Sequence, residues 1–254
     1  MTDMTKPNPA RMYDYMLGGN HNLEVDRVAA DRMLQLVPSA RNGARLNRWF
    51  IATAVEQLHA HGLTHFIDLA SGLPTQGHIH DLMPDAKIIY NDIDPVTVAY
   101  AQEILADNPN VMYLQSNLTD IDTIIASAET FFAGQQQVGV LIVGITYFIA
   151  DHDLQRVFDR LYDWCASGSQ IAMTWAVGGN LDQRSQAIMD MYAKMGQPIY
   201  LRSLAEIEKF FAKWRIVEPG MTLLDQRMGV ASWKATEENA QSLGDGYCVI
   251  IEKP

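Results

Sequence analysis

Two short apolar runs, each followed by an acidic residue, constrain the fold of this chain more than any other feature. Residues 66–67 end the first run and lead into Asp68, after which residues 70–72 (Ala-Ser-Gly) supply small side chains for a tight turn. The second run, residues 87–90, leads into Asp92. In an open α/β sheet, ligands bind beyond the carboxyl ends of the strands, where small residues let the backbone approach the ligand. The pattern therefore predicts an α/β sheet with a nucleoside site.

Asp92 and the glycine turn together indicate which nucleoside binds. An acidic side chain about 20 residues past such a turn is placed to accept hydrogen bonds from both ribose hydroxyls. No Gly-Lys-Ser/Thr sequence follows the turn, so a P-loop is not expected. A dinucleotide site requires Gly-x-Gly-x-x-Gly, whereas only Gly72 and Gly77 are present here, and Pro74 removes an amide donor between them. A ligand without phosphate would not need that donor, and S-adenosylmethionine (SAM) is such a ligand.

Longer motifs carry a resemblance to a known family. They are ARMYDYMLGG at residues 10–19, ARLNR at 44–48, SGLPTQG at 71–77, RSLAEI at 202–207 and EPG at 218–220. With Asp68 and Asp92 added, the chain resembles a bacterial family of S-adenosyl methyltransferases within the Rossmann-like SAM-dependent methyltransferases. The resemblance extends from residue 9 to residue 224, whereas residues 225–246 match no pattern of the family.

The resemblance implies a Rossmann-like α/β fold: a mostly parallel seven-stranded sheet with its last strand antiparallel, preceded by an N-terminal helical cap. We interpret residues 1–254 as one methyltransferase domain, with a cap or lid at 1–62 and a Rossmann-like core at 63–254. Apolar periodicity and turn signals place the elements. Strands are expected at residues 66–67, 87–90, 111–114, 137–143, 169–175, from 214 onward and at 247–251. Helices are expected at residues 11–17, 24–37, from Ser39 to near Gly62, and at 77–84, 96–105, 154–165, 183–195 and after Ser203.

The resemblance also implies a set of cofactor contacts. They are Arg11, Tyr13, Gly19, Asp68, Ala70, Ser71, Gly72, Thr75, Asp92, Ile93, Asn117, Leu118 and Gly144. Asn117 takes the position that bonds the adenine amino group, although it could instead cap the next turn with Asp120. Residues 11–17 have two interpretations: a segment stapled to the core, or a lid whose Arg11 or Tyr13 touches the methionyl tail. The resemblance favours the lid.

For methyl transfer, the sequence indicates the cofactor site more clearly than it indicates the catalytic residues. The protein has to align nucleophile, carbon and sulfur and keep water out, and a general base is needed only for a hydroxyl or a protonated amine. No base can therefore be assigned. The candidates near the cleft are Tyr13, Asp14 and Tyr147, with His152 and Trp175 as further ones, and the tyrosines could equally form a wall around the methyl group.

Metal binding is not expected. His78 and His80 are two residues apart and so point to different faces of a helix. His78 lies close to the cofactor turn and is a candidate for donating a hydrogen bond to a residue that contacts the cofactor. Asp151 and Asp153 flank a histidine, but helix capping explains them more simply.

The net charge of −11, from 19 basic and 30 acidic residues, disfavours a nucleic-acid substrate. Arg41, Arg45 and Arg48 recur at helical spacing and form either a solvated face or an anchor for the cofactor carboxylate. No apolar run approaches the roughly 18 residues that span a membrane. With no signal-peptide core and only Cys165 and Cys248, a cytoplasmic location is expected.

We therefore expect a SAM-dependent methyltransferase that acts on a small molecule enclosed by the N-terminal segment. One alternative is a non-catalytic protein that binds SAM or S-adenosylhomocysteine (SAH). A second is an NAD(P)-dependent oxidoreductase, against which Pro74 argues. The sequence leaves the acceptor, the methylated atom and the oligomeric state open, a homodimer included.

Overall fold

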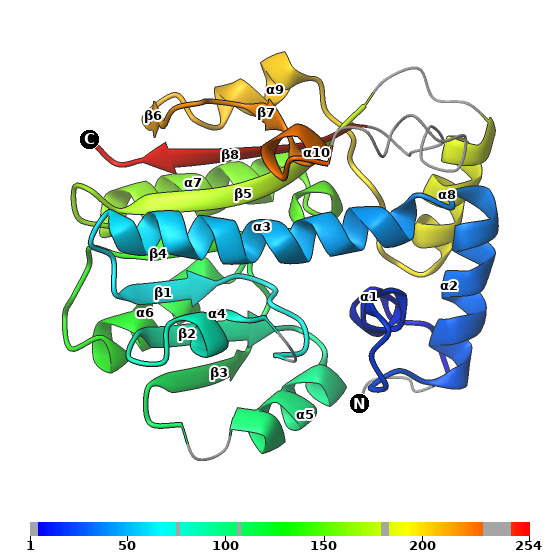
Figure 1. The fold of residues 1–254 in the computed structure, drawn as a ribbon, viewed down its shortest axis with the longest axis horizontal. Coiled ribbons are helices and arrows are strands. Elements are labelled where there is room, and N and C mark those ends of the chain that lie inside the picture. The colour runs from blue at the N-terminus through cyan, green and yellow to red at the C-terminus, as the bar shows by residue number, and fades with distance from the viewer. Residues whose placement is uncertain (1–4, 75–76, 106–107, 179–182, 231–244) are drawn as a thin grey trace.

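The structure, a computed structural model, describes residues 5–74, 77–105, 108–178, 183–230 and 245–254. Its centre is a sheet with the strand order β3-β2-β1-β4-β5-β8-β6, and β7 also pairs with β8 (Figure 1). The strands are β1 (His65–Asp68), β2 (Lys87–Asp92), β3 (Val111–Gln115), β4 (Gly139–Ile142), β5 (Gln170–Val177), β6 (Arg215–Ile216), β7 (Thr222–Leu223) and β8 (Asp245–Glu252).

The sheet confirms the predicted topology with one difference in strand number. Strands β1 to β5 are parallel, and β8 is antiparallel to β5. The predicted sixth strand is divided, so that β6 and β7 each pair separately with β8 and the sheet has eight strands. Pro219, which has no amide N–H, and Gly220, at φ 85°, lie between the two pieces and interrupt the ladder.

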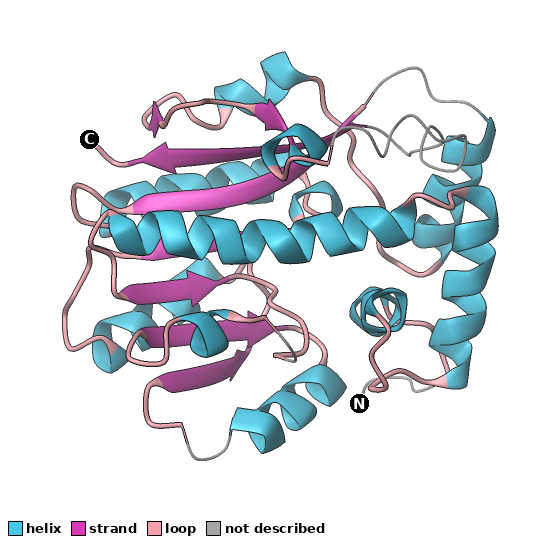
Figure 2. Ribbon diagram, in the orientation of Figure 1, coloured by secondary structure: helices cyan, strands magenta, loops and turns pink. Residues whose placement is uncertain are grey.

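Helices cover both faces of the sheet (Figure 2). The helices are α1 (Pro9–Leu17), α2 (Glu24–Leu36), α3 (Ala40–Ala60), α4 (Ile79–Leu82), α5 (Pro95–Leu105), α6 (Ile121–Phe131), α7 (Asp151–Trp164), α8 (Gln183–Lys194), α9 (Leu204–Lys209), α10 (Leu224–Arg227) and the 3₁₀ helix η1 (Thr146–Phe148). Within the described chain, none of them is both long and apolar enough to cross a bilayer.

Two hydrophobic cores hold these layers together. On one face, Val140 and Ile171 pack with residues of α6, α7 and α9, among them Phe158. On the other face, α3 crosses the sheet and buries Phe50 and Leu58. Each such side chain contributes about 1.5–3 kcal/mol on burial.

Gly139 of β4 allows α3 to approach this closely. A Cβ atom at Gly139 would lie 2.8 Å from both Leu58 Cδ2 and Phe66 Cδ1. A larger residue here would therefore push α3 away from the sheet.

Two helices differ from the sequence prediction. α4 has one turn rather than two, because Met83 precedes Pro84 and leaves the helical region at φ −132°. α6 lies where no helix is predicted from the sequence. Its buried residues recur at helical spacing, which is the signal that would have indicated it: Ile121, Ile124, Ile125 and Ala128.

The N-terminal helices form a third hydrophobic cluster, which they share with α8. Met12 and Met16 of α1 and Met33 of α2 are buried in it. Asn8 caps α1 by accepting hydrogen bonds from the amides of residues 10 and 11, and Gly18 ends the helix in the left-handed region. Because α1 lies beyond the carboxyl ends of the strands, this cluster places the cap over the edge where ligands bind (Figure 1).

Candidate cofactor and methyl-transfer site

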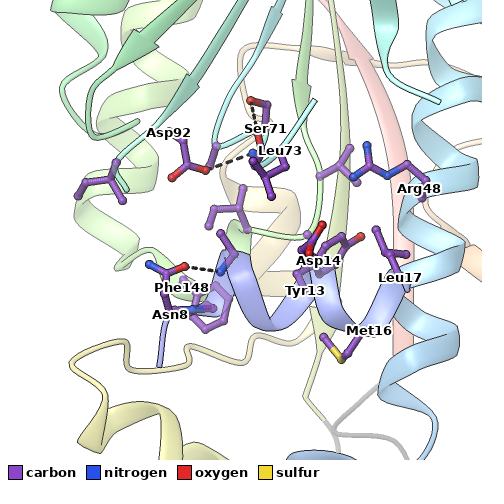
Figure 3. A pocket seen from close by; sticks show the side chains of 18 of the residues that line it. Asn8, Tyr13, Asp14, Met16, Leu17, Arg48, Ser71, Leu73, Asp92 and Phe148 are labelled. Carbon is purple, nitrogen blue, oxygen red and sulfur yellow. Dashed lines mark hydrogen bonds between the residues drawn. The ribbon is translucent and has the colours of Figure 1, made fainter. Parts of the chain in front are cut away.

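A cavity, which we call the first cavity, lies between the carboxyl edge of the sheet and α1 (Figure 3). Its walls come from α1, α3 and η1 and from the turns that follow β1, β2 and β4. Most of the residues predicted to contact the cofactor line it: Tyr13, Asp68, Ala70, Ser71, Gly72, Asp92, Ile93 and Gly144. The structure therefore brings together residues that are more than 130 positions apart in the sequence.

The turn after β1 is held in place by the end of β2. Ala70 and Gly72 both have positive φ, 56° and 65°, and such a conformation is uncommon for a residue with a Cβ. The Ala70 amide donates to Asn91 Oδ1 at 3.0 Å, and the Ser71 amide donates to the Asn91 carbonyl at 2.9 Å. Asn91 therefore fixes the strained turn against the floor of the cavity.

Asp92 faces this turn from the end of β2. Its carboxylate accepts hydrogen bonds from the amide of Gly72 at 3.1 Å (Figure 3) and from the amide of Asp94 at 2.9 Å. Burial raises the pKa of Asp92 to about 6. Each carboxylate oxygen can accept more than one hydrogen bond, so acceptor capacity is left for ligand hydroxyls.

Asp68 has a buried oxygen without a partner. The side chain ends β1, its residue is 2% exposed, and Oδ2 accepts no hydrogen bond from the described residues. Burial raises the pKa of Asp68 to about 7, while the charge of Arg48 opposes that rise. An unsatisfied buried carboxylate oxygen costs free energy, which indicates that a ligand donor belongs here.

Arg48 of α3 also lines the first cavity and is absent from the predicted contacts. Its Nη1 donates to His78 Nε2, and burial lowers the pKa of His78 well below its ordinary value, so the imidazole is neutral. His78 thus accepts a hydrogen bond at Nε2, which leaves its proton on Nδ1, and its predicted role as a donor stays a prediction. Arg45, by contrast, is exposed. The ARLNR motif is the sequence signal for Arg48, and the anchor role stays a prediction for this arginine.

Arg11 does not line the cavity within the described part of the chain. It is 1% exposed, and its guanidinium donates to Asp26 at 2.7 Å, to Asp94 at 3.4 Å and to the Lys6 carbonyl at 3.0 Å. These contacts fasten α1 to α2 and to the loop after β2. Arg11 thus fastens the helix, as the stapled interpretation expects, while Tyr13 lines the cavity and its contact with the methionyl tail stays a prediction.

Gly19 is exposed and is not among the described residues that line the cavity. Its lack of a side chain leaves room for the carboxylate of Asp14. A Cβ at Gly19 would lie 2.0 Å from Asp14 Oδ1. The Asp14 carboxylate accepts hydrogen bonds from the His21 amide at 2.9 Å and from Asn22 Nδ2 at 2.8 Å. Asp14 reaches the wall of the cavity, but its carboxylate holds the turn after α1, which makes it a poor candidate for a base.

The predicted adenine contacts lie elsewhere. Asn117 is exposed and accepts a hydrogen bond from the Thr119 amide at 3.0 Å, while its carbonyl accepts one from Asp120. Leu118 is buried in the core between the sheet and α6. Neither is among the described residues that line the cavity, so their adenine role stays a prediction. Thr75 lies outside the described residues.

Tyr13 and Tyr147 are neutral phenols. Tyr13 Oη donates to the Ala44 carbonyl at 2.9 Å, and burial raises its pKa to about 12. Burial also raises the pKa of Tyr147, whose hydroxyl has no hydrogen-bond partner among the described residues. Both rings line the first cavity and, on their other side, a second cavity. This geometry favours the interpretation of the tyrosines as walls over their interpretation as bases.

The two remaining catalytic candidates lie away from the first cavity. His152 is largely exposed on α7 and lies 3.2 Å from Asp153. Trp175 is 2% exposed, and its ring packs against Phe210 and Phe211. Among the described residues, no group of three histidine, cysteine or acidic side chains could hold a metal ion.

The fold and the site define a class. This strand order, an acidic residue at the ends of β1 and β2, and a turn without a phosphate cradle are those of Rossmann-like SAM-dependent methyltransferases. The family described as S-adenosyl methyltransferase matches residues 1–249, and the chain belongs to that family. It is therefore a SAM-dependent methyltransferase whose cofactor is SAM, as the sequence motifs predict. The comparisons lend no support to the oxidoreductase or to the non-catalytic alternative.

Solved structures similar to this chain agree with that assignment. A DUF574 family protein from Streptomyces avermitilis is 26% identical with a TM-score of 0.86, over 99% of each chain. A protein described as a methyltransferase from Thermobifida fusca is 28% identical with a TM-score of 0.85, over 99% of this chain and 96% of the other.

A more distant structure shares the fold alone. Magnesium protoporphyrin IX methyltransferase from Synechocystis PCC 6803, solved with bound SAH, is 14% identical with a TM-score of 0.57, over 96% of this chain and 93% of the other. The search of curated proteins found no match.

Proposed function

We propose that the chain transfers the methyl group of SAM to a small-molecule acceptor, with the cofactor in the first cavity and the acceptor enclosed by α1. The observation that carries this proposal is the buried Asp68 oxygen, which has no partner among the described residues and lies in the same cavity as Asp92. A carboxylate in that state favours a ligand with a cationic donor, and SAM has an ammonium group.

The residues of the first cavity fit the parts of SAM. Asp92 would accept the ribose hydroxyls, and Asp68 would pair with the ammonium group. Arg48, beside Asp68, would pair with the carboxylate. Ile93 is 58% exposed at the cavity and offers an apolar face to the adenine.

SAM, when bound, supplies an electrophilic methyl group on a positively charged sulfur. The chain contributes position and enclosure. Asp68, Arg48 and Asp92 would hold the two ends of the cofactor, and α1 with Tyr13 and Tyr147 would cover it and exclude water. Oriented approach of this kind contributes on the order of 7–11 kcal/mol in good intramolecular models.

A small-molecule acceptor is supported by the charge of the chain. With a net charge of −11, the phosphate contacts that give nucleic-acid binding most of its affinity are disfavoured. We therefore do not propose a DNA or RNA substrate.

Two experiments test the function. Calorimetry should detect SAH binding to the wild type and at least about tenfold weaker binding to Asp92→Ala, with Asp85→Ala, an exposed acid near β2, unchanged. Equal binding by Asp92→Ala would remove the ribose assignment. Incubation with labelled SAM and a metabolite extract should give a labelled small molecule, and complete absence of transfer would favour a binding protein without turnover.

A further inference from the structure

A second cavity adjoins the first cavity at Tyr13 of α1. It is bounded by α1, α2, α3, β5 and α8. Five residues line both cavities and so form the wall between them: Tyr13, Met16, Tyr147, Phe148 and Tyr192. A molecule in the second cavity would therefore lie next to the cofactor, and methyl transfer would require its nucleophile to reach between these side chains to about 3–3.5 Å from the methyl carbon.

The second cavity differs from the first in charge. The first cavity has Asp68, Asp92 and Arg48 in its lining, whereas the described lining of the second contains no acidic or basic side chain. Aliphatic side chains such as Ile188 and Ile199 form much of it. An ion entering this cavity would lose its hydration without gaining a counter-charge from the described wall.

Several polar side chains of this wall already have partners within the protein, whereas the indole Nε1 of Trp175 has none among the described residues. Thr174 Oγ1 accepts a hydrogen bond from the Gly144 amide at 2.8 Å. Tyr192 Oη donates to Met33 Sδ at 3.2 Å, and Tyr13 Oη donates to the Ala44 carbonyl at 2.9 Å. The Tyr147 hydroxyl, which has no partner among the described residues, is left to contact a ligand. The wall is thus uncharged and largely apolar in its described part, and the Tyr147 hydroxyl and the Trp175 indole N–H are polar groups that can contact a ligand.

The shape of the wall can adapt to its occupant. Met16 and Met33 both line the second cavity, and methionine side chains fit irregular apolar partners because they have three rotatable bonds and a polarisable sulfur. A planar or branched apolar molecule would be accommodated without a rigid match.

We propose that the second cavity binds the methyl acceptor and that this acceptor is an uncharged, largely apolar small molecule with its nucleophile at the Tyr13–Tyr147 wall. This inference rests on the proposed function. Since no carboxylate lines the described wall and the proton of Tyr13 is committed to Ala44, the nucleophile needs a lone pair that is free without deprotonation, as on an aromatic amine.

The transfer step balances for such an acceptor. The nitrogen lone pair forms the new N–C bond while the C–S bond breaks and its electron pair stays on sulfur. The positive charge passes from sulfur to nitrogen, and the nitrogen then loses its proton to water.

Gly43 of α3 offers a way to block only this cavity. It lines the second cavity and is not among the described residues of the first. A Cβ atom there would meet no other atom within 4 Å, so a larger side chain can be introduced without a backbone clash. Gly43→Phe should therefore fill the second cavity and leave the first intact, while Gly43→Ala serves as the matched small control.

Two fluorescent probes with the same ring skeleton test the proposal. N-phenyl-1-naphthylamine is an uncharged aromatic amine, and 1-anilinonaphthalene-8-sulfonate carries an added sulfonate. We expect the full chain to bind the uncharged probe at one site, at least about tenfold more tightly than the sulfonate, with or without saturating SAH. Gly43→Phe should weaken that binding at least about tenfold and keep SAH affinity unchanged, whereas Gly43→Ala should resemble the wild type.

Three results would overturn the proposal: equal or tighter binding of the sulfonate, unchanged probe binding by Gly43→Phe, or displacement of the probe by SAH. If Gly43→Phe does not fold, as judged by circular dichroism, Gly43→Leu takes its place in the same comparison. SAH calorimetry on the wild type keeps the two hypotheses apart. Absence of SAH binding by the wild type would contradict the proposed function, whatever the probes show.

Discussion

Arg11 of α1 and Asp94, in the loop after β2, form a buried ion pair, with Nη1 of the arginine 3.4 Å from Oδ2 of the aspartate. Both side chains are buried. The same aspartate oxygen accepts hydrogen bonds from the amide and the hydroxyl of Thr97 in the first turn of α5, and Asp94 lies two residues beyond Asp92. The cap helix α1 is thereby joined to the segment that carries the ribose carboxylate.

Replacing Arg11 should therefore destabilise the fold strongly. Arg11→Met would leave Asp26 without its buried partner at 2.7 Å, a change that typically costs about 3–5 kcal/mol. Urea unfolding should show this loss. The matched control is Arg160→Met, which removes exposed pairs with Asp122 and Asp163 and should cost about 1 kcal/mol or less. Equal losses in the two variants would contradict the role given to Arg11.

Two glycine substitutions should have opposite effects. Gly19→Ala would place a Cβ 2.0 Å from Asp14 Oδ1 and should lower the free energy of unfolding by about 1–3 kcal/mol. Gly43→Ala, within α3 and with open space around its Cβ, should raise it by up to about 1 kcal/mol. Thermal and urea unfolding of both variants would check the difference, and a neutral Gly19→Ala would show that the Asp14 turn is not tightly packed.

The raised pKa values of Asp68 and Asp92, about 7 and about 6 against an ordinary 3.8, make a prediction about stability. Between about pH 4 and pH 7 the folded chain holds protons that the unfolded chain releases, so the contribution of these groups to the free energy of unfolding falls as pH rises. Asp68→Asn should remove part of this fall. Urea unfolding at about pH 5 and pH 7.5 should show the variant gaining stability over the wild type at the higher pH. If the free energies of unfolding of the variant and the wild type differ by the same amount at both pH values, the prediction is contradicted.

Cofactor affinity should depend on pH in the opposite direction. Asp68 has to be ionised to attract an ammonium group, and its pKa of about 7 means that it loses its proton near neutrality. SAH should bind more tightly as pH rises from about 5.5 to about 8, and Asp68→Asn should bind weakly with a smaller pH dependence, because Asp92 still titrates near pH 6. Calorimetry across this range is the measurement. Equal pH dependence in the two proteins would assign the effect to another group.

The sequence patterns predicted Asp68 and Asp92 because the pairing of β1 with β2 determines where both residues lie. Asp68 pairs with Tyr90 in the parallel register of β1 and β2, so both strand ends reach the same edge. An apolar run, a small-residue turn and an acid are sufficient to indicate that edge. The family resemblance added Tyr13 and Gly144, whose positions come from α1 and from the turn after β4.

Other parts of the site depended on contacts that no local pattern encodes. Arg48 meets His78 only after α3 packs over the sheet, and the ARLNR motif alone could not distinguish an anchor from a solvated face. Arg11 is held by Asp26 of α2, so it fastens the cap and does not face the cavity. Asn117 forms a hydrogen bond with its own turn, which is the capping alternative to its predicted adenine contact.

The most direct test of the account is a crystal structure of the chain with SAH. We expect the ribose at Asp92, the adenine against Ile93, and the amino-acid end between Asp68 and Arg48, with Tyr13 and Tyr147 at the sulfur. SAH bound at another place, or a first cavity in which Asp68 makes no contact with the ligand, would contradict it.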